Sequence, residues 1–180
     1  MTRALILVER GFQDEEYVYP YYRMLEEGWQ VDVATPTGDD VHGKYGVPAR
    51  ATAKIDATSI YDVLIVPGGF ESPDRLRMID EVRLLVANHD REGRLIAAIC
   101  HGPCVLVSAG ILRGRRVTGY ESIGVDLHNA GAYYTGESVT VDRNLITARH
   151  YRDNGYFMKA LIAAVAARES RQFEEGAHAL

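Results

Sequence analysis

The chain of 180 residues has few cysteines, few prolines and no excess of basic residues. Its 2 cysteines, at positions 100 and 104, are too few for a disulfide framework, and a metal site would need further ligands close by. Lys and Arg total 20 against 25 Asp and Glu, so the net charge is −5 and we expect no nucleic-acid partner. Because no Walker loop and no G-x-G-x-x-G fingerprint after a strand occurs either, we expect neither a cofactor nor a metal.

Long apolar runs are also missing. The run near the N-terminus, residues 4–8, is short, whereas a signal peptide needs an apolar core of about 7–15 residues and a membrane span needs about 18–20. We therefore expect a cytoplasmic protein with no membrane partner. The length fits one domain, which we place at residues 1–170. Residues 171–180 lack periodicity, so we expect them to form a flexible tail.

Short apolar runs alternate with segments of helical period, which is typical of an α/β sandwich with a mainly parallel sheet. We expect strands at residues 4–8, 29–35, 61–66, 94–99 and 116–119, a hairpin near 44–53, and a second hairpin formed by 139–141 and 145–148. We expect helices at residues 16–27, 74–91, 104–109, 123–129 and 151–169. Pro20 is expected to kink the first helix or to mark its regular start.

Cys100 lies in the segment AAICHGP, where an expected strand ends and an expected helix begins. The small residues Ala98 and Gly102 flank the turn, as in a nucleophile elbow with sulfur in place of the serine oxygen. Open α/β sheets bind ligands at the carboxyl ends of their strands, and the start of a helix favours a thiolate. A packed core cysteine is the alternative, but the strand, turn and helix together favour a nucleophile.

Three other features are expected at the same edge of the sheet. His101 would normally point away from its neighbour and would act as a base only in an unusual turn, so a solvent-facing histidine is the alternative. Gly68 and Gly69 follow a strand, and their backbone N–H groups either hold an oxyanion or belong to an ordinary turn. Residues 11–16 carry three carboxylates, which also suit the start of a helix.

Several motifs resemble the DJ-1/PfpI superfamily, in particular its PfpI branch of small intracellular cysteine hydrolases and stress proteins. They lie in order between residues 4 and 166 and comprise AAICHGP, VPGG, the FxDxExxxP block at 12–20, LxxGxxV from Leu25, SAGILRGRRVT at 108–118, NAG at 129–131 and VTVDRNLIT at 139–147. The resemblance implies a flavodoxin-like three-layer sandwich in which Cys100 is the nucleophile.

The resemblance also implies roles for other residues. Glu16 should be protonated and hydrogen-bonded to the sulfur, because burial beside a negative charge raises the pKa of a carboxyl group. Asp74 takes the place of an acidic residue, more often Glu, that reaches His101 of a neighbouring subunit. The triad would then be complete only in a homodimer, and dimers of this branch can assemble into hexamers. Tyr120 should line the mouth of the pocket.

Two other features are interpreted as structural. Cys104, four residues after Cys100, is interpreted as a packed cysteine rather than a resolving thiol, because a disulfide at that spacing would be strained. Arg149 and His150 are interpreted as a solvated strand end.

Three functions remain open at this point. The favoured one is a stress-protection enzyme in which the Cys100 thiolate attacks small electrophilic carbonyls, as glyoxalases of the III type and protein deglycases do. A PfpI-like intracellular cysteine peptidase or amidase, acting on peptide substrates, is the alternative and needs His101 to protonate a leaving amine. A redox sensor or holdase without turnover is the third.

Overall fold

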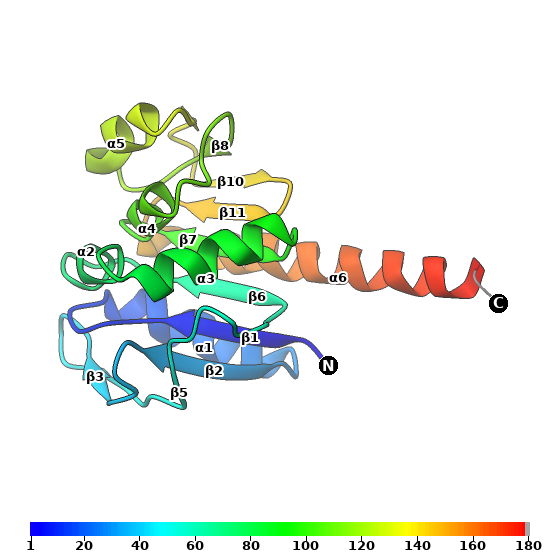
Figure 1. Ribbon diagram of the computed structural model, residues 1–180, viewed down its shortest axis with the longest axis horizontal. Coiled ribbons are helices and arrows are strands. Elements are labelled where there is room, and N and C mark those ends of the chain that lie inside the picture. Colours follow the sequence, from blue (N-terminus) through cyan, green and yellow to red (C-terminus); the bar gives the residue numbers. More distant parts are fainter. Residues whose placement is uncertain (179–180) are drawn as a thin grey trace.

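The computed structural model describes residues 1–178 and places a seven-stranded sheet between two layers of helices (Figure 1). The strand order is β10-β11-β7-β6-β1-β2-β5, and each neighbouring pair is parallel except β10 with β11. The predicted α/β fold with a mainly parallel sheet is confirmed. The strands are β1 (Arg3–Leu7), β2 (Gln30–Thr35), β5 (Ala53–Lys54), β6 (Val63–Val66), β7 (Leu95–Ile99), β10 (Val139–Asp142) and β11 (Leu145–Ala148).

Each face of the sheet buries its own hydrophobic core, because successive side chains of a strand point to opposite faces. In β1, Ala4 and Ile6 pack toward α1 (Asp14–Glu26) and α6 (Asn154–His178). Leu5 and Leu7 pack on the other face. That face is covered by α2 (Ser72–Leu76), α3 (Asp80–Arg91), α4 (Pro103–Ser108) and α5 (Gly124–Asn129). Strands buried on both faces explain the continuous apolar runs in the sequence.

Three helices differ from the sequence prediction. The single helix expected over residues 74–91 is divided into α2 and α3, because Ile79 is extended (φ −95°, ψ 123°) and packs against the core. The first helix begins at Asp14 and runs through Pro20, so Pro20 does not mark its start. The last helix continues to His178, beyond the expected end at residue 169. Residues 179–180 of the predicted tail lie outside the described residues.

Each of three further pairings involves a strand of two residues. The hairpin expected near residues 44–53 is formed by β3 (Val41–His42) and β4 (Pro48–Ala49). β5 instead adds to the edge of the main sheet beside β2. β8 (Arg116–Val117) lies in the strand expected at residues 116–119 and pairs in parallel with β9 (Tyr133–Tyr134). The sequence analysis missed β9 because two residues carry no periodicity.

The carboxyl ends of β1, β6, β7 and β11 meet at one edge, because these four strands are adjacent and parallel. The loops that leave this edge include residues 8–13, residues 67–71, Cys100 and residues 149–153. Among the helices of residues 1–178, none combines the length and the apolar character that crossing a membrane requires.

Candidate active site

Cys100 occupies a sharp turn directly after β7. Its backbone has a positive φ of 60°, which is uncommon for a residue other than glycine and is typical of functional sites. Two hydrogen bonds hold the turn: the Cys100 N–H donates to the Ala148 carbonyl at 2.9 Å, and the Tyr120 N–H donates to the Cys100 carbonyl at 2.9 Å. A Cβ at Gly102 would overlap the carbonyl oxygen of Val66, so only glycine permits this close approach. The nucleophile elbow predicted from the sequence is present.

His101 turns back toward the sulfur. Its Nδ1 lies 3.3 Å from Cys100 Sγ, and its Nε2 lies 3.4 Å from Ser122 Oγ. The ring also stacks on Tyr120, with centroids 5.0 Å apart and planes 24° apart. Side chains adjacent in sequence normally diverge, and the left-handed conformation of Cys100 is the unusual turn that brings this pair together. Burial lowers the pKa of His101, as does the nearby Lys44 ammonium, so the ring is neutral at pH 7.

Glu16 extends from the first turn of α1 into the same site. The side chain is fully buried; the Gly68 N–H donates to its Oε2 at 2.7 Å, whereas Oε1 has no hydrogen-bond partner. Burial raises the pKa of Glu16 from 4.5 to about 7, although the hydrogen bond from Gly68 acts against the rise. The carboxyl group is therefore ready to hold a proton close to neutral pH.

Burial also raises the pKa of the Cys100 thiol, and the nearby Glu16 carboxylate raises it further. The backbone N–H groups of His101 and Gly69 face the sulfur and act in the opposite direction. The sequence analysis considered only the helix start, which favours a thiolate, whereas burial and Glu16 act against ionisation of this thiol in the structure. The six-residue α4 begins three residues after Cys100, so its dipole is weak at the sulfur, while burial is nearly complete. Ionisation of this thiol needs a base, and His101 is in contact with it.

The two glycines of the predicted oxyanion site have different functions in the structure. The Gly68 N–H donates to Glu16, so it positions the carboxyl group. Gly69 has a φ of 107°, and a Cβ there would overlap the carbonyl oxygen of Gly11. Its N–H faces the Cys100 sulfur together with that of His101. The pair of donors next to the sulfur therefore comes from Gly69 and His101.

Asp74 lies on the exposed surface of α2. Within the described part of this chain, the hydrogen-bond partners of His101 are Cys100 and Ser122. The expected contact between Asp74 and His101 joins two subunits, and it stays a prediction. Sequence reasoning missed Ser122, and its place two residues after Tyr120 is the one signal that could have found it.

Lys44 is a second residue of the site that sequence reasoning missed. The buried Asp14 accepts hydrogen bonds from two backbone N–H groups of the β3–β4 hairpin, one of them from Tyr45 at 2.9 Å. The hairpin is thereby tied to the start of α1. The Lys44 ammonium lies 5.1 Å from the centroid of the Tyr45 ring and 5.5 Å from that of the Phe70 ring. Its charge lowers the pKa of His101. It supplies a positive charge at the edge of the site.

Cys104 packs on the opposite face of the sheet from Cys100. Burial raises its pKa to about 11, and both cysteines are free. The arrangement supports its interpretation as a packed cysteine. In the part of the chain that the structure describes, no three His, Cys, Asp or Glu side chains are grouped as metal ligands.

Comparisons with known proteins identify the family. The sequence pattern of the DJ-1/PfpI family matches residues 2–164. The chain belongs to the DJ-1/PfpI family. Within this family it is 35% identical over 162 residues to the deglycase PH1704 of Pyrococcus horikoshii, covering 89% of this chain and 97% of that protein. It is equally 35% identical over 162 residues to the deglycase PfpI of Pyrococcus furiosus, with 89% and 97% covered.

Other relatives extend the comparison. The Bacillus subtilis protein YraA, provisionally named a cysteine protease, is 38% identical over 151 residues, covering 82% of this chain and 88% of YraA. Among solved structures, a two-domain Anabaena variabilis protein with DJ-1/PfpI-like and ferritin-like domains is similar with a TM-score of 0.89 at 32% identity. The match covers 92% of this chain and 48% of that one. DJ-1β of Drosophila melanogaster has a TM-score of 0.82 at 28% identity, with 87% and 86% covered.

Replacing Ser122 with alanine is expected to lower kcat/KM by about two- to tenfold, because one neutral hydrogen bond to His101 contributes about 0.5–1.5 kcal/mol. The dependence of the rate on pH should change as well, because the orientation of the His101 ring toward the Cys100 sulfur depends on this contact. The pH profile of kcat/KM measures both effects, and Ser170→Ala, on the exposed surface of α6, is the matched control. An unchanged profile in Ser122→Ala would show that Ser122 does not position His101.

Proposed function

We propose that this protein is a cysteine-dependent enzyme that protects against small electrophilic carbonyls, with glyoxalase and deglycase activity. One observation carries the proposal: Cys100 Sγ lies 3.3 Å from His101 Nδ1 and beside a buried carboxyl group whose pKa is about 7. A thiol with a raised pKa, a neutral histidine to take its proton and a second proton carrier suffice for attack on a reactive aldehyde. The deglycase names of relatives at 35% identity support the same chemistry.

The first step transfers the Cys100 proton to His101 Nδ1 as sulfur attacks the aldehyde carbon of a 2-oxoaldehyde. A carbon–sulfur bond forms, and the carbonyl electron pair moves to oxygen. The N–H groups of Gly69 and His101, which face the sulfur, are placed to receive this oxyanion. The proton held by His101 then passes to that oxygen and gives a hemithioacetal.

The second stage moves hydrogen between the two substrate carbons. The proton on the carbon bonded to sulfur is transferred to the neighbouring carbonyl carbon, and the proton of the hemithioacetal hydroxyl moves to the neighbouring carbonyl oxygen. The carbon–oxygen double bond thereby passes to the carbon bonded to sulfur, which gives a thioester of a 2-hydroxy acid. Glu16, whose pKa is about 7, is the group placed to carry the proton. Water hydrolyses the thioester, so that methylglyoxal and water yield lactate and the free thiol.

Deglycation follows the same route but begins with an amine adduct in place of the free 2-oxoaldehyde. In an adduct of a 2-oxoaldehyde with an amine, the sulfur replaces nitrogen at the former aldehyde carbon. The carbon–nitrogen bond breaks, and the amine leaves with the proton that His101 took from Cys100. The product on sulfur is the same hemithioacetal. Free and amine-bound 2-oxoaldehydes are therefore substrates of one site.

Peptide hydrolysis is the second candidate, favoured by the contact between Cys100 and His101 and by the name of YraA. Peptide hydrolysis requires more acid catalysis from His101 than attack on an aldehyde does, because the amine of an unactivated amide leaves only when a protonated histidine donates a proton to it. The described partner of His101 Nε2 is the Ser122 hydroxyl, which stabilises an imidazolium less than a carboxylate does. The favoured substrates are accordingly reactive aldehydes and their adducts.

Three substrates distinguish these functions in one experiment. The purified protein is incubated with methylglyoxal, with methylglyoxal-treated Nα-acetyl-lysine and with a fluorogenic peptide. We expect lactate from the first two and no cleavage of the third. Cleavage of the peptide without lactate would favour the peptidase. If none of the three is converted while peroxide oxidises Cys100 to sulfinate, the redox sensor or holdase replaces the enzyme.

A further inference from the structure

A small cavity adjoins the active site on the far side of the Tyr120 ring. We call it the side pocket; it measures about 220 Å³ and is lined by Tyr120, Glu121, Arg149, His150, Arg152 and Asp153. Its position follows from the sheet, since β11 pairs with β7 so that Ala148 lies opposite Ile99. The Tyr120 ring stacks on His101 and lies 5.8 Å from His150, so it forms the wall between the two sites.

Asp153 brings an unsatisfied negative group into the side pocket. The residue is 7% exposed, and its Oδ2 is buried without a hydrogen-bond partner in the described part of the chain. The nearest cation, Nε of Arg149, lies 3.8 Å from Oδ2, which is beyond hydrogen-bond distance. A buried carboxylate oxygen without a donor is costly. The position therefore suits a ligand that donates hydrogen bonds and carries positive charge.

The other charges of the side pocket make it suitable for a ligand with both signs. Arg149 and Arg152 supply two cations, whereas Glu121 and Asp153 supply two anions. The Arg152 guanidinium lies 5.6 Å from the centroid of the Tyr151 ring and is held beside the pocket. His150 accepts a hydrogen bond from the Arg152 N–H through Nδ1, which fixes the loop. A group with one ammonium and one carboxylate matches this distribution.

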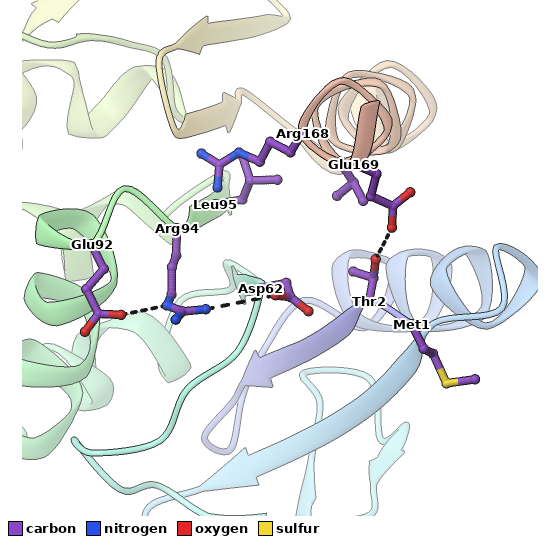
Figure 2. A pocket seen from close by; sticks show the side chains of 9 residues that line it. Met1, Thr2, Asp62, Glu92, Arg94, Leu95, Arg168 and Glu169 are labelled. Atoms are coloured by element: carbon purple, nitrogen blue, oxygen red, sulfur yellow. Dashed lines mark hydrogen bonds and ion pairs between the residues drawn. The ribbon is translucent and has the colours of Figure 1, made fainter. Parts of the chain in front are cut away.

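A larger cavity at the opposite edge of the sheet serves as a comparison (Figure 2). It measures about 390 Å³ and also contains charged side chains, but these are paired with other protein groups. Arg94 contacts Glu92 at 2.7 Å, Asp62 accepts a hydrogen bond from the Arg3 N–H at 2.8 Å, and Glu169 accepts one from Thr2 at 2.9 Å. Because its charges are satisfied internally and it lies at the amino ends of the strands, it gives no comparable reason to expect a ligand.

We propose that the side pocket binds the free α-ammonium and α-carboxylate groups of an amino acid whose side chain carries a carbonyl adduct to Cys100. The ammonium group donates to Asp153, and the carboxylate pairs with Arg152. The long side chain of lysine or arginine passes along the Tyr120 ring to the sulfur. The inference rests on the proposed function and gives the enzyme a preference, among its adduct substrates, for side-chain adducts of residues with free α-groups.

Direct binding tests the side pocket without any turnover. Titration calorimetry with L-lysine and with Nα-acetyl-lysine amide uses the full chain carrying Cys100→Ser. We expect L-lysine to bind and the doubly capped compound to bind at least about tenfold more weakly, because each charged hydrogen bond contributes a factor of that order. Asp153→Asn and Arg152→Met should each weaken L-lysine binding about tenfold. Arg91→Met, an exposed arginine at the end of α3, should bind like the parent.

The kinetic test uses methylglyoxal adducts of L-lysine and of Nα-acetyl-lysine amide. The KM for the L-lysine adduct is expected to be about tenfold lower than the KM for the capped adduct, and this difference should disappear in Asp153→Asn. Arg152→Met tests the same point at an exposed position, which keeps the result independent of any folding defect in Asp153→Asn. Equal binding of L-lysine and its capped form would overturn the side-pocket assignment. L-lysine binding without turnover of any adduct would instead contradict the proposed function and leave the side pocket in place.

Discussion

Replacing Cys100 with serine is expected to lower kcat/KM for methylglyoxal by at least about a thousandfold, as is typical when a catalytic nucleophile is removed. The geometry gives the reason. His101 Nδ1 lies 3.3 Å from the sulfur and can take a thiol proton, but a serine hydroxyl in the same place ionises far less readily. The rate of lactate formation by purified wild-type and variant protein measures the loss.

Cys104→Ser is the matched control, because Cys104 is as buried as Cys100 but packs on the other face of the sheet. It should retain wild-type activity within about twofold, since surface and packing changes remote from a site leave its chemistry intact. Retention of more than a tenth of the activity in Cys100→Ser would mean that another group performs the attack.

Replacing Glu16 with glutamine is expected to stabilise the folded protein by up to about 3 kcal/mol at pH 8. The pKa of Glu16 rises from 4.5 to about 7 on folding, and each tenfold change in proton affinity corresponds to about 1.4 kcal/mol. Between pH 4.5 and 7 the unfolded carboxyl has lost its proton while the folded one retains it. Stability therefore falls as pH rises through this window, and glutamine, which does not ionise, removes the loss.

Urea unfolding of the wild type and of Glu16→Gln from pH 4 to pH 8 measures this difference. The two proteins should be about equally stable near pH 4, and the gap should open as the pH rises toward 8. Glu137→Gln is the control, because the Glu137 side chain is exposed and is not among the groups that shift the pKa of Glu16. A constant difference across the pH range would show that the burial of the Glu16 charge does not limit stability.

The same substitution is expected to slow turnover about a hundredfold, because general acid–base groups typically contribute factors of that order or more. Glutamine keeps an oxygen to accept the Gly68 N–H but cannot exchange a proton with substrate. Glu16 would thus be an instance of a side chain that reduces stability to provide catalysis. Steady-state lactate formation, measured on the same protein samples, tests this part.

The elbow was predictable because local rules determine it. An apolar strand, a cysteine, Gly102 and Pro103 follow one another, and the close approach of Val66 to Gly102 explains why glycine is needed there. The parallel sheet was also predictable, because short apolar runs alternate along the chain with segments of helical period. The role of Glu16 could be predicted only from the family resemblance. Residues 11–16 contain three carboxylates, and the sequence alone gives no reason to choose among them.

The remaining features depend on contacts between distant segments. Whether His101 faces the sulfur depends on one backbone angle of Cys100, which the sequence does not encode locally. Ser122 and Lys44 reach the site through loops whose paths are set by tertiary packing. The pKa of the thiol is raised by burial and by Glu16 on another helix, and a local argument from the helix start includes neither of these effects.

Alkylation of the two cysteines by iodoacetamide, followed by peptide mass spectrometry at a series of pH values, tests the central pairing of Cys100 with Glu16. Cys100 is predicted to react while Cys104 stays unmodified, because only Cys100 has a histidine in contact with its sulfur. In Glu16→Gln the pH of half-maximal reaction at Cys100 should move lower, because the charge that raises the thiol pKa is gone. Faster reaction at Cys104, or an unchanged midpoint in Glu16→Gln, would contradict the account.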